Sequence, residues 1–259
     1  MIDPPSIPGL ALSFIGGGAV SITWSMVMSA APKSVWWGPV IHHGPSNRRE
    51  IALTFDDGPD GDSTPRILDV LGEHGASAVF FVIGQNAQRF PHVIKRIADE
   101  GHLIGNHTWD HDHHGYLRGD AYWESQIDRT NELVAQITGT LPTLFRPPMG
   151  IRTGYTMHAA ARAGMSVITW SRRGLDGVAT TARAIENRIG PTARAGEIVI
   201  LHDGVEPNIR RSPDATVAAI GPILRQWQLR DLHPVRLDRW LDRSVGVPDT
   251  PATTETVSR

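Results

Sequence analysis

Apolar and polar positions along this chain form short blocks of two kinds. Apolar runs bounded by glycine, proline or acidic residues predict buried β-strands. They lie at residues 51–55, 78–83, 103–105, 144–145, 166–169 and 198–201, with a further candidate at 234–237. Segments with helical character lie between them, at residues 66–74, 91–100, 120–138, 155–163, 180–189 and 212–228. This repeated pairing predicts an α/β fold with a mainly parallel sheet, either open or closed into a barrel.

The two ends of the chain depart from this alternation. Residues 4–32 carry no formal charge, and residues 10–31 are long enough to span a bilayer. The stretch fits an uncleaved anchor, a signal peptide cleaved after Ser29-Ala30-Ala31, or a buried helix, and we expect a membrane-targeting segment. The expected divisions are a targeting segment at 1–32, a linker at 33–48, a main domain at 49–243 and a disordered tail at 244–259.

The charges around the apolar stretch bear on its orientation. No Lys or Arg precedes it, whereas Lys33, Arg48 and Arg49 follow it. Because positive charge gathers on the cytoplasmic side of membrane segments, this pattern would place the main domain in the cytoplasm, which argues against export. We expect a membrane-anchored or exported protein that faces the cell envelope, with its orientation left open.

Composition narrows the possible classes of function. The net charge is −2 and no basic run contains interleaved aromatic residues, so we expect no nucleic-acid partner. The absence of cysteine excludes disulfides, thiolate metal sites and a cysteine nucleophile. Four of the twelve histidines fall within eight residues, at His107, His111, His113 and His114. This cluster directs attention to metal binding and acid–base chemistry.

Polar side chains follow four of the predicted strands at the point where each strand ends. The segments are Asp56-Asp57, Asn106-His107-Thr108-Trp109-Asp110-His111, Arg146-Pro147-Pro148-Met149-Gly150 and His202-Asp203-Gly204. In a parallel α/β architecture all of these positions lie at the carboxyl ends of the strands, where such folds build their active sites. The pattern therefore predicts one shared site at this rim.

The spacing of the rim residues suggests their chemistry. Adjacent side chains of an extended strand point in opposite directions, so Asp56 and Asp57 are expected to differ in role: one binds a cation and the other faces a water. His107 and His111 are four residues apart, so a helical turn would present both imidazoles on one face. Two imidazoles and one carboxylate are a common set of catalytic zinc ligands, although an exposed pair of helix histidines is the simpler alternative.

Taken together, these segments resemble the motifs of the polysaccharide deacetylase family, carbohydrate esterase family four. Its members include chitin, peptidoglycan and acetylxylan deacetylases and the nodulation-type chitooligosaccharide deacetylases. The resemblance covers about residues 49–243 with the motif order and spacing intact. The matching segments are Thr54-Phe55-Asp56-Asp57-Gly58-Pro59, His107-Thr108-Trp109-Asp110-His111, Arg146-Pro147-Pro148-Met149-Gly150 and Leu201-His202.

The resemblance implies a distorted (β/α) barrel with about seven parallel strands and an active site at their carboxyl ends. It further implies that one divalent metal ion, usually zinc in this family, is held by Asp57, His107 and His111. By the same resemblance Asp56 is the general base paired with Arg146, and His202 is the general acid, which Asp176 orients and charges.

Two positions depart from the family pattern. Gly177 follows Asp176 where the fourth motif usually carries Trp, and Met149 stands where an aromatic residue is common in the third motif. Neither change touches the expected metal ligands or the acid–base pair. The departures therefore put the identity of the substrate in doubt.

We expect a metal-dependent hydrolase that deacetylates an N-acetylglucosamine-containing glycan of the chitooligosaccharide or peptidoglycan type. The same chemistry on acetylxylan O-acetyl groups, or on a lipid-linked formylated amino sugar, is an alternative. Alternatives of other classes are an inactive glycan-binding module and an iron oxygenase with two histidine ligands and one carboxylate. The six polar groups at the rim argue against the binding module. The wide separation of the carboxylate from the histidines, with a second acidic residue beside it, favours water activation over the oxygenase.

Overall fold

Strand β1, Glu50–Asp56, lies inside a parallel sheet and brings the first site residues to its end. The structure is a computed structural model that describes residues 28–207, 209 and 211–241. On one side β1 pairs with β7, Ile198–His202, in a register that sets Asp56 beside His202. On the other side it pairs with β2, Val79–Val82. Base and acid candidates that are far apart in the sequence therefore become neighbours across one pair of strands.

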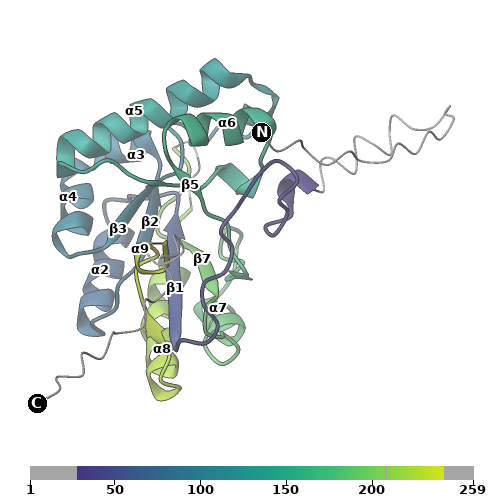
Figure 1. The fold of residues 1–259 in the computed structure, drawn as a ribbon. Helices are drawn as coiled ribbons and strands as arrows, with labels where there is room; N and C mark the ends of the chain where they lie inside the picture. The colour runs from purple at the N-terminus through teal and green to yellow at the C-terminus, as the bar shows by residue number, and fades with distance from the viewer. Residues whose placement is uncertain (1–27, 208, 210, 242–259) are drawn as a thin grey trace, which may run out of the picture.

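Every strand pair in the described residues is parallel, and the sheet curls with helices around it (Figure 1). The sheet order is β5-β4-β3-β2-β1-β7-β6, and β8 pairs with the start of β1. The remaining strands are β3 Leu103–Asn106, β4 Leu144–Phe145, β5 Ser166–Val167, β6 Arg172–Arg173 and β8 His233–Pro234. The predicted distorted (β/α) barrel with about seven parallel strands is confirmed.

Helices connect the strands and cover the outside of the sheet (Figure 1). They are α2 Ser63–Glu73, α3 Gly84–Arg89, α4 Pro91–Asp99, α5 Asp120–Thr138, α6 Gly154–Arg162, α7 Ala182–Ile189, α8 Asp214–Leu229 and α9 Asp238–Leu241, with short 3-10 turns at η1 Gly115–Leu117 and η2 Pro148–Gly150. The sequence pattern misses α3, α9 and β6, because each is too short to show a period. It places the last strand at 234–237, whereas β8 occupies His233–Pro234.

The alternation of side chains along β1 divides the core into two layers. Ile51, Leu53 and Phe55 pack in the outer cluster with the covering helices, whereas Ala52 packs in the cluster that fills the barrel interior. Because side chains two positions apart share a face, Asp56 belongs with Ala52 on the inner face. The period of the strand thus directs the first carboxylate into the barrel.

The segment before β1 lies against the open seam of the sheet. The Ile41 backbone N–H donates to the Val167 carbonyl at 2.9 Å, and Ile41 bridges to Ile168 in parallel. His43 then bridges to Glu197 just before β7. Residues 41–43, expected to belong to a linker, therefore connect the β5 side of the sheet to the start of β7. The apolar Ile41 side chain explains this placement, since it packs on the interior cluster.

Residues 28–37 are also tied to the domain. The Arg152 guanidinium is buried, and it donates to the carbonyls of Ala31 at 2.6 Å and Gly150 at 2.9 Å. The Thr169 hydroxyl donates to the Pro32 carbonyl at 2.7 Å. The end of the expected targeting segment is thus bonded to the segments that follow β4 and β5. The rest of that segment and the tail beyond Leu241 lie outside the described residues, within which no helix is both long and apolar enough to cross a membrane.

These contacts distinguish two truncations of the chain. Removing residues 1–27 deletes none of the bonds described above, whereas removing residues 1–32 leaves the buried Arg152 guanidinium without its Ala31 acceptor. We expect the shorter chain to lose about 1–3 kcal/mol of unfolding free energy. Thermal unfolding followed by circular dichroism should then show a midpoint lower by roughly 5 °C for the 1–32 truncation.

A double-mutant cycle supplies the control for this expectation. Arg152→Leu should cost less stability in the chain that lacks residues 1–32 than in the chain that lacks residues 1–27. Equal midpoints for the two truncations would show that the bonds to residues 28–32 do not stabilise the domain.

Candidate active site

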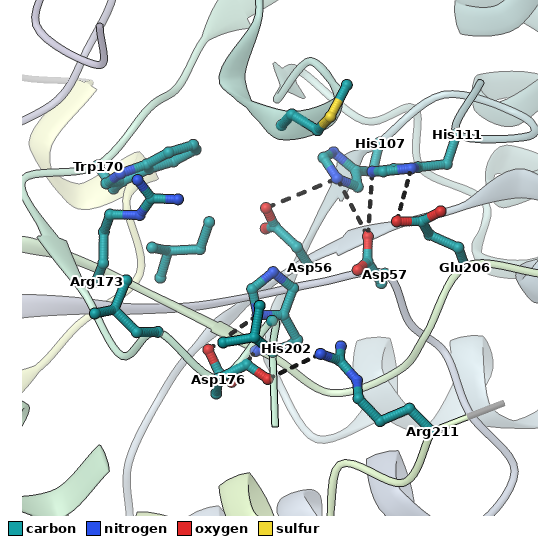
Figure 2. Close-up of a pocket in the computed structure, with 15 residues that line it drawn as sticks. Asp56, Asp57, His107, His111, Trp170, Arg173, Asp176, His202, Glu206 and Arg211 are labelled. Atoms are coloured by element: carbon teal, nitrogen blue, oxygen red, sulfur yellow. Dashed lines mark hydrogen bonds and ion pairs between the residues drawn. The ribbon is translucent and has the colours of Figure 1, made fainter. Parts of the chain in front are cut away.

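A cavity of about 270 Å³ opens at the carboxyl ends of the strands. Figure 2 shows that Asp56, Asp57, His107, His111, Asp176 and His202 all line it. The cavity wall is completed by Met149, Trp170, Arg173, Leu175, Gly177, Val178, Ile200, Glu206 and Arg211. Arg146 lies beneath the wall, fully buried. The structure therefore brings together all seven residues that the sequence singled out.

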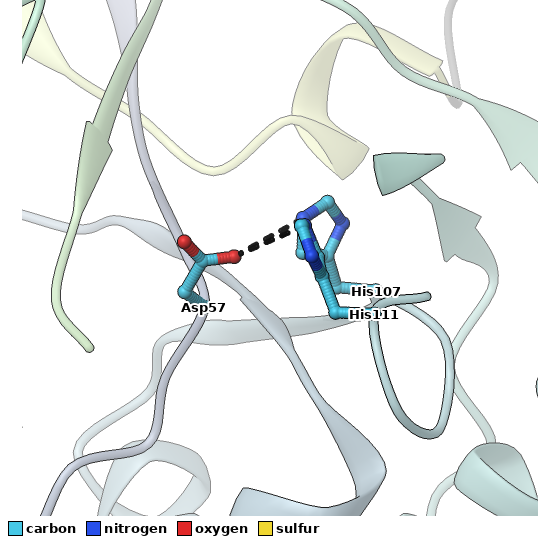
Figure 3. A group of neighbouring side chains, drawn as sticks. All are labelled: Asp57, His107 and His111. Carbon is cyan, nitrogen blue, oxygen red and sulfur yellow. Dashed lines mark ion pairs between the residues drawn. The ribbon is translucent and has the colours of Figure 1, made fainter. Parts of the chain in front are cut away.

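Asp57, His107 and His111 form a compact group of metal-ligating side chains (Figure 3). Both imidazole Nε2 atoms lie 3.5 Å from the same Asp57 Oδ1. A tetrahedral ion with ligands at about 2.0–2.2 Å separates neighbouring ligand atoms by roughly this distance. Asp57 Oδ1 is buried and has no hydrogen-bond partner in the described part of the chain. The group thus fits a divalent metal ion, which would occupy the space that the three atoms surround.

The protonation of the group also fits metal binding. His107 Nδ1 lies 2.6 Å from the Arg146 carbonyl oxygen, so Nδ1–H donates there and Nε2 keeps its lone pair. Burial alone would raise the pKa of Asp57, but the close contact with His107 and the charge of His111 lower it. The carboxylate therefore stays ionised. One anionic oxygen and two imidazole nitrogens face a common point.

The loop that carries both histidines differs from the expected helical turn. His107–His111 follows β3 as irregular backbone, with Thr108 at φ 71° and His111 at φ 56°. The Asn106 side chain accepts from the Thr108 N–H at 2.7 Å, and the Gln126 side chain of α5 accepts from the Trp109 N–H at 2.8 Å. These side chains satisfy backbone donors that a helix would have bonded internally, and the left-handed residues turn both rings inward.

Left-handed backbone is concentrated around the cavity. Asp57, His111, Met149 and Leu175 have φ of 71°, 56°, 55° and 57°, and all four line the wall. Non-glycine residues in this region are strained by sterics and persist where the surroundings fix them, often at functional sites. At Asp57 this conformation corrects the expectation from strand alternation. Because the chain leaves the extended form there, the Asp56 and Asp57 carboxylates both face the cavity.

Asp56 is held by a buried ion pair. Arg146 Nη1 donates to Asp56 Oδ1 at 2.6 Å and to the Thr54 hydroxyl at 2.8 Å. The guanidinium also lies 4.0 Å from the centre of the Phe81 ring. Burial lowers the pKa of Arg146, and the charge of Asp56 partly offsets that effect. Asp56 Oδ2 remains on the cavity side, 3.7 Å from His107 Nε2.

His202 lies beside Asp56 on the neighbouring strand β7, and its imidazole is paired with Asp176. His202 Nδ1 lies 3.0 Å from Asp176 Oδ1, and the His202 backbone N–H donates to Asp176 Oδ2 at 2.8 Å. Burial would lower the pKa of His202, but the hydrogen bond and charge of Asp176, with the charges of Asp57 and Asp56, raise it to about 9. The imidazole is thus held in its charged form with Nε2 free to donate.

The two departures from the family pattern shape the wall beside His202. A side-chain carbon added at Gly177 would lie 3.2 Å from His202 Cε1, so a larger residue there would crowd the imidazole. Leu175, Val178 and Met149 are exposed and line the cavity instead. The wall is therefore rebuilt from aliphatic side chains.

Two acidic residues lie near the group without a role predicted from the sequence: Glu206, which the sequence analysis does not single out, and Asp203, which it names only as part of a rim segment. Glu206 Oε1 lies 3.5 Å from His111 Nδ1, and its other oxygen lies 2.6 Å from His113 Nε2. Asp203 is fully buried behind the site and accepts from the Thr64 hydroxyl at 2.6 Å. Its carboxylate packs so closely on Gly58 that a side-chain carbon there would meet it at 2.0 Å. The sequence does carry one signal for both residues: they follow closely after β7, whose carboxyl end lies at the rim.

Comparison with known proteins gives consistent matches. Residues 43–168 match the family model described as polysaccharide deacetylase. A peptidoglycan-N-acetylglucosamine deacetylase of Bacillus cereus is 38% identical over 172 residues, which cover 66% of this chain and 62% of that protein. The match therefore spans less than two thirds of that relative. A chitooligosaccharide deacetylase of Bradyrhizobium sp. is 33% identical over 198 residues, or 73% of this chain and 90% of that protein.

Solved structures match over most of the described residues. The crystal structure of the Bc1960 peptidoglycan N-acetylglucosamine deacetylase superposes with a TM-score of 0.70 at 33% identity, covering 77% of this chain and 91% of that one. A CE4 family pseudoenzyme from Bacillus anthracis superposes with a TM-score of 0.71 at 22% identity, covering 79% and 69%. The second likeness concerns the fold alone.

The geometry predicts which histidines the protein needs in order to bind the metal ion. His107→Ala or His111→Ala should remove most bound zinc, because three protein ligands are the usual minimum for a catalytic zinc site. His114→Ala is the matched control, since His114 is exposed on the same loop and outside the group. Metal content measured after dialysis should fall for the first two variants alone. Stoichiometric zinc in all three would refute this ligand assignment.

Proposed function

Because the chain belongs to the polysaccharide deacetylase family, we propose that it is a hydrolase that removes N-acetyl groups from an N-acetylglucosamine-containing glycan. The similarity to peptidoglycan and chitooligosaccharide deacetylases supports this class of substrate. The proposal rests chiefly on one observation about the cavity. A base candidate and an acid candidate, Asp56 and His202, flank the group of Asp57, His107 and His111 in a single cavity.

Amide hydrolysis needs a proton removed from water and a proton delivered to the departing nitrogen. A divalent metal ion at Asp57, His107 and His111 would lower the pKa of a bound water and polarise the acetyl carbonyl. Asp56 accepts the proton of the attacking water, and Arg146 fixes its orientation through Oδ1 while Oδ2 stays exposed to the cavity. The base is thus held in place before the substrate arrives.

His202 supplies the second proton. Its Nε2–H faces the cavity because Nδ1 is directed at Asp176. Protonation of the amine makes it the better leaving group, so the tetrahedral intermediate breaks toward products and does not revert. Asp176 is suited to this support because the hydrogen bond and charge of His202 lower its own pKa despite burial, which keeps it ionised.

Zinc is the metal we propose. Two neutral imidazoles and one carboxylate leave a fourth tetrahedral position for water, which is the usual arrangement of catalytic zinc. A binding module without activity would need neither Asp56 beside Arg146 nor His202 beside Asp176. Burying the Arg146 charge is costly even when Asp56 pairs with it, and we infer that the pair is kept because Asp56 acts in catalysis.

Acetate release from a small panel of substrates tests the function. Zinc-loaded protein should release acetate from chitotetraose or from a peptidoglycan tetrasaccharide, and Asp56→Asn should lower turnover by roughly a hundredfold or more while the zinc content stays the same. Release from acetylxylan alone would favour the O-acetyl alternative. No release from any of the three by zinc-loaded protein would contradict the proposal, and metal loss in Asp56→Asn would reassign Asp56 as a ligand.

The His202–Asp176 pair predicts the basic limb of the pH profile. An acid with a raised pKa is protonated below that pKa and loses its function as pH rises through it. Asp176→Asn removes the charge that raises the pKa of His202 but leaves the burial that lowers it. The basic limb of kcat should therefore move down by about one pH unit or more, with unchanged zinc content.

A second variant separates charge from hydrogen bonding. The Thr216 hydroxyl donates to Asp176 Oδ2 at 2.7 Å, so Thr216→Val removes one bond and no charge. This variant should move the basic limb less than Asp176→Asn does. A profile for Asp176→Asn that overlays the parent on the basic side would show that Asp176 does not tune the acid.

A further inference from the structure

Arg173 lines the cavity with a guanidinium that has no carboxylate partner in the described part of the chain. It lies on β6 next to Arg172, and the two side chains differ sharply in their contacts. Arg172 is paired with Glu197 at 2.5 Å and donates to the Thr192 hydroxyl at 2.9 Å. Arg173 is exposed, and its guanidinium carbon lies 5.3 Å from the centre of the Trp170 ring. Arg172 is therefore structural, whereas the charge of Arg173 is available.

The Trp170 ring gives the guanidinium a fixed support. Trp170 is buried, and its ring packs so closely on Gly150 that a side-chain carbon there would lie 2.5 Å away. A guanidinium over an indole face is attracted to the ring and loses part of its conformational freedom. Its donors remain free to form paired hydrogen bonds with a planar anion such as a carboxylate.

The cavity is electrically asymmetric. Asp57 and Glu206 lie on the side of the metal-ligating histidines, whereas Arg173 and Trp170 lie on the opposite side (Figure 2). Arg211 also lines the cavity, but it donates to the Asp176 carbonyl at 3.2 Å. Arg211 is thus held beside the His202–Asp176 pair, whereas Arg173 lies over the Trp170 ring and its donors have no protein acceptor among the described residues.

We propose that Arg173, supported by Trp170, forms an anion subsite that recognises a carboxylate on a sugar adjacent to the one being deacetylated. The proposal rests on the proposed function and names the class of glycan within it, an acidic one. A carboxylate is planar and matches the two-donor edge of a guanidinium. The exposed Leu175 and Val178, which line the same cavity, can cover the apolar faces of the sugar rings.

A matched set of substrates tests the subsite. The set contains a peptidoglycan tetrasaccharide with free lactyl carboxylates, the same tetrasaccharide with these groups converted to amides, and neutral chitotetraose. The parent should show a higher kcat/KM for the acid than for its amide. Arg173→Gln should reduce this preference roughly tenfold, mainly through KM, the order expected for one hydrogen-bonded charge pair.

Three controls separate recognition from structure. Arg173→Lys keeps the charge and should retain part of the preference, while Arg225→Gln removes an exposed arginine of α8 outside the cavity and should leave it unchanged. Raising the ionic strength should weaken the preference in the parent and have little effect on Arg173→Gln. Equal values for acid and amide in the parent, or an unchanged ratio in Arg173→Gln, would overturn the subsite.

Binding distinguishes failure of the subsite from failure of the proposed function. Calorimetry of zinc-loaded Asp56→Asn with the acid and the amide measures recognition without turnover. Tighter binding of the acid that Arg173→Gln abolishes would support the subsite even if the parent released no acetate. Equal binding of the two tetrasaccharides, with acetate release intact, would refute the subsite and leave the function standing.

Discussion

The buried Arg146 guanidinium is the contact on which the rest of the site depends. It pairs with Asp56 on β1, and its backbone carbonyl accepts from His107 after β3. Its Nη2 also donates to the Thr169 carbonyl at 3.2 Å. A single residue after β4 therefore orients the proposed base, fixes the tautomer of one proposed metal ligand and joins three parts of the barrel. A charge buried so completely is stable only while these partners remain, because an unpaired buried charge costs several kcal/mol.

The backbone around the cavity is likewise held by contacts with other segments of the chain. The sheet delivers side chains to its carboxyl rim, but strand geometry alone would send neighbouring residues to opposite faces. Left-handed residues at Asp57 and His111 turn their side chains back toward the cavity. Polar side chains such as Asn106 and Gln126 hold the loop in this shape by accepting its backbone donors. The strained backbone conformations thus lie next to the cavity. Helix α5 helps to hold them there through Gln126.

Charged side chains are distributed unevenly over the two sides of the cavity. Carboxylates surround the positions suited to a metal ion, and Asp176 keeps His202 protonated beside them. On the other side, Arg173 lies on Trp170 without a carboxylate of its own among the described residues. Gly177 keeps the space next to the His202 imidazole open. The proposed acid–base pair and the wall beside it share a segment, because Asp176 lies between Leu175 and Gly177 in the sequence.

The sequence alone determined the α/β class, most of the strands and the identity of the rim residues, because periodicity and the order of the motifs are local properties. The rim segments and the family resemblance together predict all seven candidate site residues, namely Asp56, Asp57, His107, His111, Arg146, Asp176 and His202. Tertiary structure decided what locality could not: the irregular loop that replaces a helical turn at His107–His111, the bonds between Arg152 and residues 28–34, and the contact of Glu206 with His111. Each depends on a partner that is distant in the sequence, and no periodic pattern records such a partner.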